Sequence, residues 1–402
     1  MTRLLVLFVT AFVDMVGLVM IVPLLPFYAT DFGANALLVG VLISAFSVAQ
    51  LAVAPLWGRL SDRYGRRPAI LAGLAMSAAA YVVFAFAQSV EVLLLSRLAQ
   101  GLGGGTIGVV QAYVADVSTP DQRTKSLGWL SAVTSLGAVV GPAFGSTMVG
   151  IGGQRAPGLA AAALSVLVAL FAWRFLRESR ELRTSGSHAM PTAATSRAAL
   201  ARVVSHWREP APRLIWIYAV AIGAFYGTVQ TVPLLLEERL GVTAQTVGAF
   251  ITYLGGMGVL VRSLVLGRMV DRLGEARLSR LGAVLLAAGL ALTGLAHGGW
   301  VLLIAFTLMP VGTGFLFPCV TGLLSQVVPL RERGLYMGVQ HTYGGVSRVA
   351  FPIAAGFLMD RFGVGVPFWI SGLLVLATLP LSAALTRSGS LSPEVAGKQS
   401  TE

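Results

Sequence analysis

Apolar stretches recur along almost the whole chain, separated by short polar connections. A helix needs roughly 20 predominantly apolar residues to cross the hydrocarbon core of a bilayer, and most of these stretches reach that length. The pattern therefore predicts an all-α membrane protein with twelve transmembrane helices. These helices are predicted at residues 4–26, 38–57, 69–87, 92–115, 127–149, 157–176, 213–236, 244–267, 279–297, 301–325, 336–358 and 364–386.

One polar segment is much longer than the other connections, and it lies between the sixth and seventh predicted spans. Residues 177–212 carry Ser, Thr and Pro together with many arginines. This composition is typical of a connector that lies along a membrane surface. We therefore predict an N-terminal six-helix bundle over 1–176, a C-terminal six-helix bundle over 213–386 and a tail over 387–402.

The two predicted bundles repeat each other in sequence. The segment from Gly58 to Gly65 recurs from Gly267 to Gly274 at an offset of 209 residues, and other glycine and proline pairs recur at 209 or 210. Several matches in nearly constant register indicate an internal repeat rather than chance. Many transporters are built from two such halves. We expect two pseudo-symmetric six-helix bundles.

Composition and charge narrow the class of protein. The chain is 56% hydrophobic and 11% charged, with a mean hydropathy of +0.79, which excludes a soluble domain. Of 29 Lys and Arg, 23 fall on one side of the predicted spans, three on the other side and three within spans. Positive residues accumulate in cytoplasmic loops. The net charge of +12 therefore encodes topology rather than nucleic-acid binding. We predict a multi-pass inner-membrane protein with both termini, the connector and the tail in the cytoplasm.

Residues for enzyme or cofactor chemistry are scarce. The single cysteine, Cys319, lies inside the tenth predicted span, and the four histidines are scattered. Glycines at 103, 105 and 108 fit a dinucleotide-binding spacing, but they lie within a span that lacks the preceding strand such a site requires. We expect no enzyme activity, no metal and no cofactor.

Four charged residues inside predicted spans break the repeat. An intramembrane charge costs roughly 2.5–3.5 kcal/mol or more at the helix centre, so each is a candidate for function. In the register of the repeat, the opposed pairs are Asp14 and Ala224, Arg97 and Phe306, Arg262 and Val53, and Arg348 and Ala138. Alanine satisfies packing at the position that matches Asp14, so packing alone does not explain why an acid is present there. Arg262 lies close enough to the end of its span to snorkel.

Four motifs resemble those of the major facilitator superfamily, and the resemblance runs from the first span to the twelfth. The motifs are the loop Gly58-Arg-Leu-Ser-Asp62-Arg63-Tyr-Gly65-Arg66-Arg67-Pro68, the fourth-span segment Leu95–Gly103, the fifth-span antiporter motif Gly137–Gly145, and the first-span segments Asp14–Gly17 and Pro23–Pro26. The first-span segments resemble those of the twelve-span drug/proton antiporters, including tetracycline exporters. One departure is Ser146, where the fifth-span motif usually has a second glycine. The resemblance implies the major facilitator fold.

The loop motif predicts a conformational latch. Its members are Gly58, Asp62, Arg63, Gly65, Arg66, Arg67 and Asp116. The two glycines allow a short, tightly turned connection, and Asp62 can meet the N-terminal dipole of another helix. The arginines can pair with Asp116 at the cytoplasmic end of the fourth span, which would hold the outward-facing state. The alternative is that the arginines only set topology, which leaves Asp62 without a role.

The fifth-span motif places small residues on one face of its helix. Gly137, Gly141 and Gly145 repeat every four residues, and small residues allow two membrane helices to approach closely. Pro142 removes a backbone hydrogen bond and favours a kink. Plain helix packing explains the stripe, and the resemblance adds a second interpretation, a tight contact that prevents leakage between the bundles.

Asp14 is the predicted proton carrier. It lies about ten residues into its span, near the midplane at about 1.5 Å of rise per residue. A carboxyl group shielded from water keeps its proton to a higher pH, so a site that faces each side of the membrane in turn can load and release protons. Arg97 is expected to tune it, although its predicted depth is nearer the outer surface. The alternative is a structural carboxylate satisfied by neighbouring hydroxyls or an arginine.

The predicted function is proton-coupled export of a small amphipathic compound, such as an antibiotic, by alternating access. Substrate-binding candidates are Gln230 in the seventh span and, on one face of the eleventh, His341 and Arg348; such residues more often form interhelical hydrogen bonds. A sugar or metabolite exporter of the same fold and a non-transporting membrane receptor are the alternatives. The expected partners are a small molecule, protons and lipid, with the protein acting as a monomer.

Overall fold

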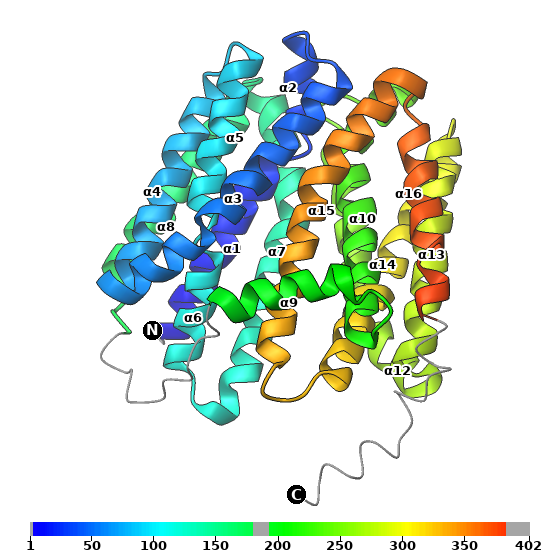
Figure 1. Cartoon of the computed structure of the whole chain (residues 1–402). Coiled ribbons are helices and arrows are strands. Elements are labelled where there is room, and N and C mark those ends of the chain that lie inside the picture. Colours follow the sequence, from blue (N-terminus) through cyan, green and yellow to red (C-terminus); the bar gives the residue numbers. More distant parts are fainter. Residues whose placement is uncertain (1–2, 180–192, 383–402) are drawn as a thin grey trace, which may run out of the picture. The chain divides into compact units, whose positions relative to one another are not determined.

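The computed structural model describes residues 3–179 and 193–382, and every element of secondary structure in these ranges is helical (Figure 1). Within them, ten segments are apolar and long enough to cross a membrane. The eleventh predicted span is the 30-residue helix Arg333–Phe362, and the twelfth is the shorter apolar helix Val366–Ser382. The predicted all-α fold with twelve transmembrane helices is confirmed.

The helices of the first half extend beyond most predicted ends, because capping residues rather than hydropathy set helix ends. These helices are α1 (Arg3–Ile21), α2 (Leu25–Asp31), α3 (Ala36–Tyr64), α4 (Arg66–Ala85), α5 (Val90–Gly104), α6 (Ile107–Val117), α7 (Pro120–Gly152) and α8 (Ala156–Phe175). The side chain of Asn35 accepts a hydrogen bond from the backbone N–H of Leu38 and so caps α3. α7 begins at Pro120, a residue suited to the first helical position.

The second half contains the connector helix and the remaining spans. Its elements are α9 (Ala193–Ser205), α10 (Pro210–Leu240), α11 (Val247–Leu260), the π-helix η2 (Val261–Val265), α12 (Leu266–Leu273), α13 (Glu275–Leu295), α14 (Gly299–Val327), α15 (Arg333–Phe362) and α16 (Val366–Leu376). α11, η2 and α12 together form the eighth span. Residues 180–192 of the predicted connector, and the chain from 383 on, lie outside the described residues.

Two spans of the first half are broken. The first span is interrupted between α1 and α2, beside Pro23, which has no N–H to donate to the helix. The fourth span is interrupted between Gly104 and Ile107. Side chains of α3 satisfy backbone carbonyls at this second break, since Trp57 Nε1 donates to Leu102 O at 2.7 Å and Gln50 Nε2 donates to Gly104 O at 3.1 Å. In a membrane such replacement partners are needed wherever a helix is broken.

The chain divides into two compact units. Over the described residues, the first unit takes in Met1–Ser187 and Gln230–Gly256, and the second takes in His188–Val229 and Met257–Glu402. In the first unit α1 packs on α7 and α8, α4 packs on α5 and α8, and α3 packs on α5. In the second unit α13 packs on α14 and α16. The domain boundaries drawn from the sequence stay predictions.

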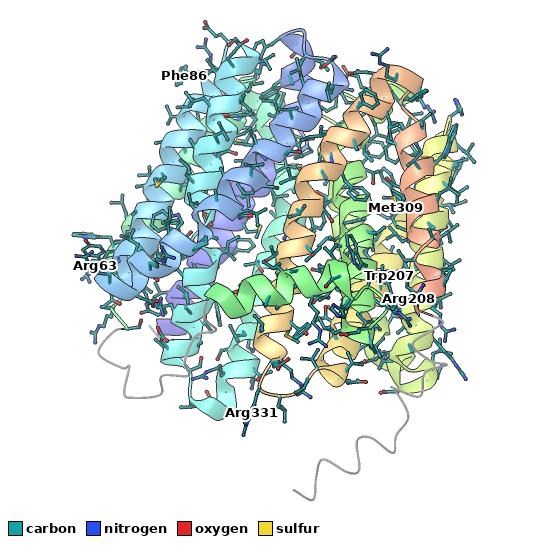
Figure 2. All side chains as sticks on the ribbon, in the orientation of Figure 1. Arg63, Phe86, Trp207, Arg208, Met309 and Arg331 are labelled. Carbon is teal, nitrogen blue, oxygen red and sulfur yellow. The ribbon has the colours of Figure 1, made fainter. Side chains whose placement is uncertain are left out.

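The connector helix α9 is anchored to the second unit. The hydroxyl of Tyr343 in α15 donates to the carbonyl of Leu200 at 3.0 Å, and Trp216 Nε1 in α10 donates to the carbonyl of Val203 at 3.1 Å. Val203 itself is fully buried. Figure 1 shows α9 running crosswise to α10 and α15, and the stacked Trp207 and Arg208 follow its last residue (Figure 2).

Candidate functional site

A cavity of about 620 Å³ lies within the first unit, and Asp14 is on its wall. The cavity is lined by residues of α1, α4, α5, α6 and α7, together with Thr106 at the break in the fourth span. Helix α1 presents Asp14 to it from the middle of an apolar helix. Asp14 is the only acid that lines this cavity among the described residues.

Polar side chains from three other helices share the cavity with Asp14. Tyr81 comes from α4, Gln100 from α5 and Gln111 from α6, and serine and threonine hydroxyls of α4 and α7 complete the polar part of the wall. The Tyr81 side chain lies within electrostatic range of both Asp14 and Arg97. Tyr81 therefore lies near both the acid and the arginine, which the sequence placed at different depths.

Arg97 is a fully buried cation without a carboxylate partner among the described residues. Its side chain is 1% exposed, Nη1 donates to Gln100 Oε1 at 2.6 Å, and the guanidinium lies 5.0 Å from the ring centroid of Phe46. Arg97 Nε and Gln100 Nε2 are buried without a hydrogen-bond partner. Buried polar atoms normally have partners, so this pair marks a position with unused hydrogen-bonding capacity.

The break in the fourth span lies at the cavity. Gly104, Thr106, Ile107 and Gly108 all line it. Non-helical backbone at membrane depth is tolerated where it is buried in protein or lines a cavity. Gly103 and Gly105 lie close to neighbouring helices, since an added methyl at Gly105 would be 2.5 Å from Trp57. These two glycines serve close helix approach, whereas an added methyl at Gly108 would meet no atom within 4 Å.

The internal repeat shows that this polar set is confined to the first half. In the register of 209 or 210, the counterparts of Asp14, Tyr81, Arg97 and Gln100 are Ala224, Leu290, Phe306 and Met309. All four counterparts are apolar and at most 1% exposed, and Met309 lies among the helices of the second unit (Figure 2). The fold therefore packs well without the polar set. Its presence in the first half calls for a functional explanation.

Arg66 is the centre of the loop motif. Its Nη1 lies 2.9 Å from Asp62 Oδ1 and its Nε lies 3.1 Å from Asp116 Oδ2, and Nη1 also donates to Ser61 Oγ at 2.6 Å. The predicted pairing with Asp116 is thus made by Arg66. It joins the end of α3, the start of α4 and the end of α6.

The other latch residues have different positions. Arg63 stacks on Tyr64, with its guanidinium 5.3 Å from the ring centroid, and points away from the helices (Figure 2). Arg67 donates from Nη2 to the carbonyl of Trp173 in α8. α3 continues through Gly58, so the expectation that this glycine helps to form the turn is wrong. Gly65 alone forms the turn, at a φ of 107°.

Glu178, just after α8, binds the first residues of α4. Its two carboxylate oxygens accept hydrogen bonds from the backbone N–H groups of Arg66 at 2.9 Å and Arg67 at 3.1 Å. The first N–H groups of a helix have no partner within it and favour negative charge. Glu178 is therefore the acid that meets the N-terminus of α4. The sequence had offered Asp62 as one possibility for such a role.

The glycine stripe of α7 faces α1. Methyl groups added at Gly137, Gly141 and Gly145 would lie 2.7, 2.9 and 2.3 Å from backbone carbonyl oxygens of α1. Next to the stripe, Ser146 Oγ donates to Ala244 O at 2.8 Å and accepts from Gly248 N at 2.9 Å. The residue that departs from the motif therefore binds the start of α11, within the first unit.

The remaining predicted substrate contacts fall in different units. Gln230 is half-buried in α10 and belongs to the first unit. His341 and Arg348 belong to α15 in the second unit, where Arg348 lies 5.9 Å from the ring centroid of Tyr226. Sequence reasoning missed Tyr81 and Gln100 as parts of the cavity, although comparison of the two repeats at uncharged positions would have found both.

The fold and the cavity are those of a membrane transporter, and comparisons with known proteins name its family. The chain matches the model of the Major Facilitator Superfamily over residues 7–265 and 252–400. It therefore belongs to that superfamily, and the resemblance drawn from its motifs is confirmed.

Its relatives include drug-resistance proteins. The chain is 27% identical over 377 residues to Multidrug resistance protein 2 of Bacillus subtilis, covering 92% of each protein. It is also 27% identical over 399 residues to the class B Tetracycline resistance protein of Escherichia coli, covering 98% of this chain and 97% of the relative. A solved inward-facing bacterial homologue of the human lysosomal transporter Spinster matches with a TM-score of 0.82 at 15% identity, over 96% of each chain. This last likeness concerns the fold.

Proposed function

We propose that this protein is a proton-coupled exporter of small amphipathic compounds, of the kind that resistance proteins remove from cells. The observation that carries the proposal is the position of Asp14, an ionisable carboxylate on the wall of a membrane-embedded cavity whose counterpart in the other half is a buried alanine. The names of the relatives, multidrug and tetracycline resistance proteins, support the choice of substrate.

In the proposed cycle Asp14 binds a proton when the cavity faces the outside and releases it when the cavity faces the cytoplasm. Substrate entering the cavity favours the deprotonated form, so the two exchange. Tyr81 lies within electrostatic range of Asp14 and of Arg97, and in this proposal it lies between the two. Arg97 is a positioning residue in this proposal, held by Gln100 and Phe46.

The loop motif and the fifth-span motif serve the conformational change in this proposal. The bridge from Asp62 through Arg66 to Asp116 holds three helix ends together in one state and breaks in the other. The glycine contact of α7 with α1 holds these two helices of the first unit together, so the stripe is not a contact between the bundles, and the bonds of Ser146 hold the start of α11 against α7.

The orientation and assembly follow from charge and size. The bias of 23 basic residues to three supports cytoplasmic termini in the inner membrane. In this proposal the two six-helix bundles of one chain, at 1–176 and 213–386, form the transporter, and the functional unit is a monomer.

The test of the proton carrier is Asp14→Asn in proteoliposomes. A growth-inhibition screen with tetracycline, norfloxacin and ethidium first identifies a transported compound. Substrate-induced proton release is then measured at several pH values. Asp14→Asn should abolish proton release and uphill export with little change in abundance, because asparagine keeps the shape but cannot titrate. Asp14→Glu should retain partial activity.

The matched control is Asp31→Asn, which neutralises an exposed carboxylate at the end of α2. This variant should behave like the wild type. Proton release from Asp14→Asn at the wild-type level would eliminate Asp14 as the carrier. Export that survives a dissipated proton gradient would refute proton coupling itself.

A further inference from the structure

The second unit contains a cation in the middle of an apolar helix. Arg348 lies 15 residues after the first residue of α15 and 14 before its last, which is about 20 Å from either end at about 1.5 Å per residue. Its side chain is half-buried, and Nε is buried without a hydrogen-bond partner. A cation at such a position is costly unless something compensates it.

Carboxylates of the second unit lie far along the chain from Arg348, at helix ends. In its described part the acids are Glu209, Asp271, Glu275, Glu332 and Asp360. The nearest on α15 is Asp360, twelve residues away, or about 18 Å along the helix. The part of α10 that packs on α15 carries neither acid nor base between 214 and 229. The described residues of the unit form no ion pair with Arg348.

Aromatic rings lie near this cation. Arg348 lies 5.9 Å from the ring centroid of Tyr226, and it acts electrostatically on Tyr218 and His341. The ring of Tyr218 in turn packs edge-on against Phe317 at 5.5 Å. We call these five residues the Arg348 cluster. Tyr226 is 39% exposed and His341 is exposed, so the cluster has an open side.

The helix pair that carries the cluster matches the pair that carries Asp14. In the first half the glycines of α7 receive α1. In the second half Gly223 and Gly227 of α10 receive Phe351 of α15, three residues from Arg348. α10 corresponds to α1 and α15 to α7 in the repeat. In the middle of its spans each pair therefore bears one charge that its counterpart lacks, negative in the first half and positive in the second.

We infer that the Arg348 cluster binds the anionic group of the transported compound, and that the substrates include planar aromatic molecules carrying a carboxylate or a comparable acid. The inference rests on the proposed export function and names a substrate class for it. The guanidinium supplies the charge and an unused N–H donor. Tyr226 and Tyr218 supply faces and edges on which an aromatic ring can pack.

The phosphate of an anionic lipid has the same chemistry as a substrate carboxylate. Either anion would balance the charge of Arg348, but only the substrate would also pack on the adjoining rings. The measurement is therefore made in nanodiscs of phosphatidylcholine, and repeated with phosphatidylglycerol added.

The experiment is equilibrium binding to the purified full-length protein without a proton gradient, using nalidixate and its neutral methyl ester. The wild type should bind the carboxylate about ten-fold or more tightly than the ester, as a charge-assisted hydrogen bond predicts. Arg348→Gln should abolish this preference, and Arg348→Lys should retain part of it. The matched control is Arg262→Gln, since Arg262 already donates from Nε to the carbonyl of Gly258 at 3.0 Å. It should keep the full preference.

Several outcomes would overturn the inference. The first is an equal preference for the carboxylate over the ester in Arg348→Gln and in the wild type. The second is a wild type that shows no such preference or binds neither compound. The third is an interaction with phosphatidylglycerol that depends on Arg348 while the carboxylate preference does not. Size-exclusion profiles check that each variant folds. Because no proton gradient is present, a failed proton-coupling test with Asp14 and a failed binding test here are distinguishable.

Discussion

The contact between α7 and α1 makes a quantitative prediction for Gly145→Ala. The added methyl would lie 2.3 Å from the carbonyl oxygen of Met20 and 2.7 Å from its Cγ. Met20 is the penultimate residue of α1, so its carbonyl moves only with the end of that helix, and α1 or α7 must shift. Overpacking of this kind typically costs about 1–3 kcal/mol, and the position calls for the upper end of that range.

Helix propensity offsets part of this cost, because alanine is about 1 kcal/mol more favourable than glycine in a helix. The expected net loss is then about 2 kcal/mol. Gly150 is the matched control on the same helix, since an added methyl there meets no atom within 4 Å. Gly150→Ala should stabilise by about 0.5–1 kcal/mol. The two variants should therefore differ by about 2–3 kcal/mol.

Thermal unfolding in detergent, followed by the fluorescence of the seven tryptophans, measures this difference. Gly137→Ala and Gly141→Ala should fall between the two extremes, since their added methyls would lie 2.7 and 2.9 Å from carbonyl oxygens. Equal melting temperatures for Gly145→Ala and Gly150→Ala would refute the reasoning. So would a Gly141→Ala variant less stable than Gly145→Ala.

Two further predictions concern the polar contacts of the first unit. Ser146→Ala should lower the melting temperature, because it removes bonds to Ala244 O and Gly248 N, and such bonds are worth about 0.6 kcal/mol each on average in a membrane protein. An unchanged melting temperature would show that the start of α11 needs no such partner. Asp62→Asn should impair transport without preventing membrane insertion, because Asp62 pairs with Arg66, whereas Asp271→Asn should be milder. Equally severe transport losses in both would indicate that the two copies of the loop share one role.

The sequence predicted the spans well because length and hydropathy determine them. It did not predict where helices break. Pro23 is a visible cause for the break after α1, but the break after Gly104 depends on tertiary partners, the side chains of Gln50 and Trp57. The π-helix η2 was not predicted either, because nothing in the sequence of Val261–Val265 indicates altered hydrogen bonding.

The site was predicted in part, for a similar reason. Asp14 and Arg97 stood out because charge is rare in a membrane span, whereas Tyr81 and Gln100 are neutral and drew no attention. Glu178 could not be foreseen. Its carboxylate reaches the start of α4 only because α8 brings the chain back beside it, at a separation of more than a hundred residues.

Gly65 and its repeat partner Gly274 share a backbone conformation but differ in the space around them. Both have positive φ, 107° and 73°, which disfavours most side chains. At Gly274 the surroundings are open, whereas a methyl at Gly65 would lie 2.4 Å from a carboxylate oxygen of Glu178. The ψ angles of the two glycines, 160° and 157°, place both outside the left-handed region that asparagine tolerates, in a region that essentially only glycine occupies. The backbone alone therefore requires glycine at position 274. At position 65 both the backbone conformation and the lack of space disfavour any side chain. Of the two turns, only the first is also tied to a distant segment, so a change at Gly65 would disturb the contact of Glu178 with the start of α4 as well as the turn itself.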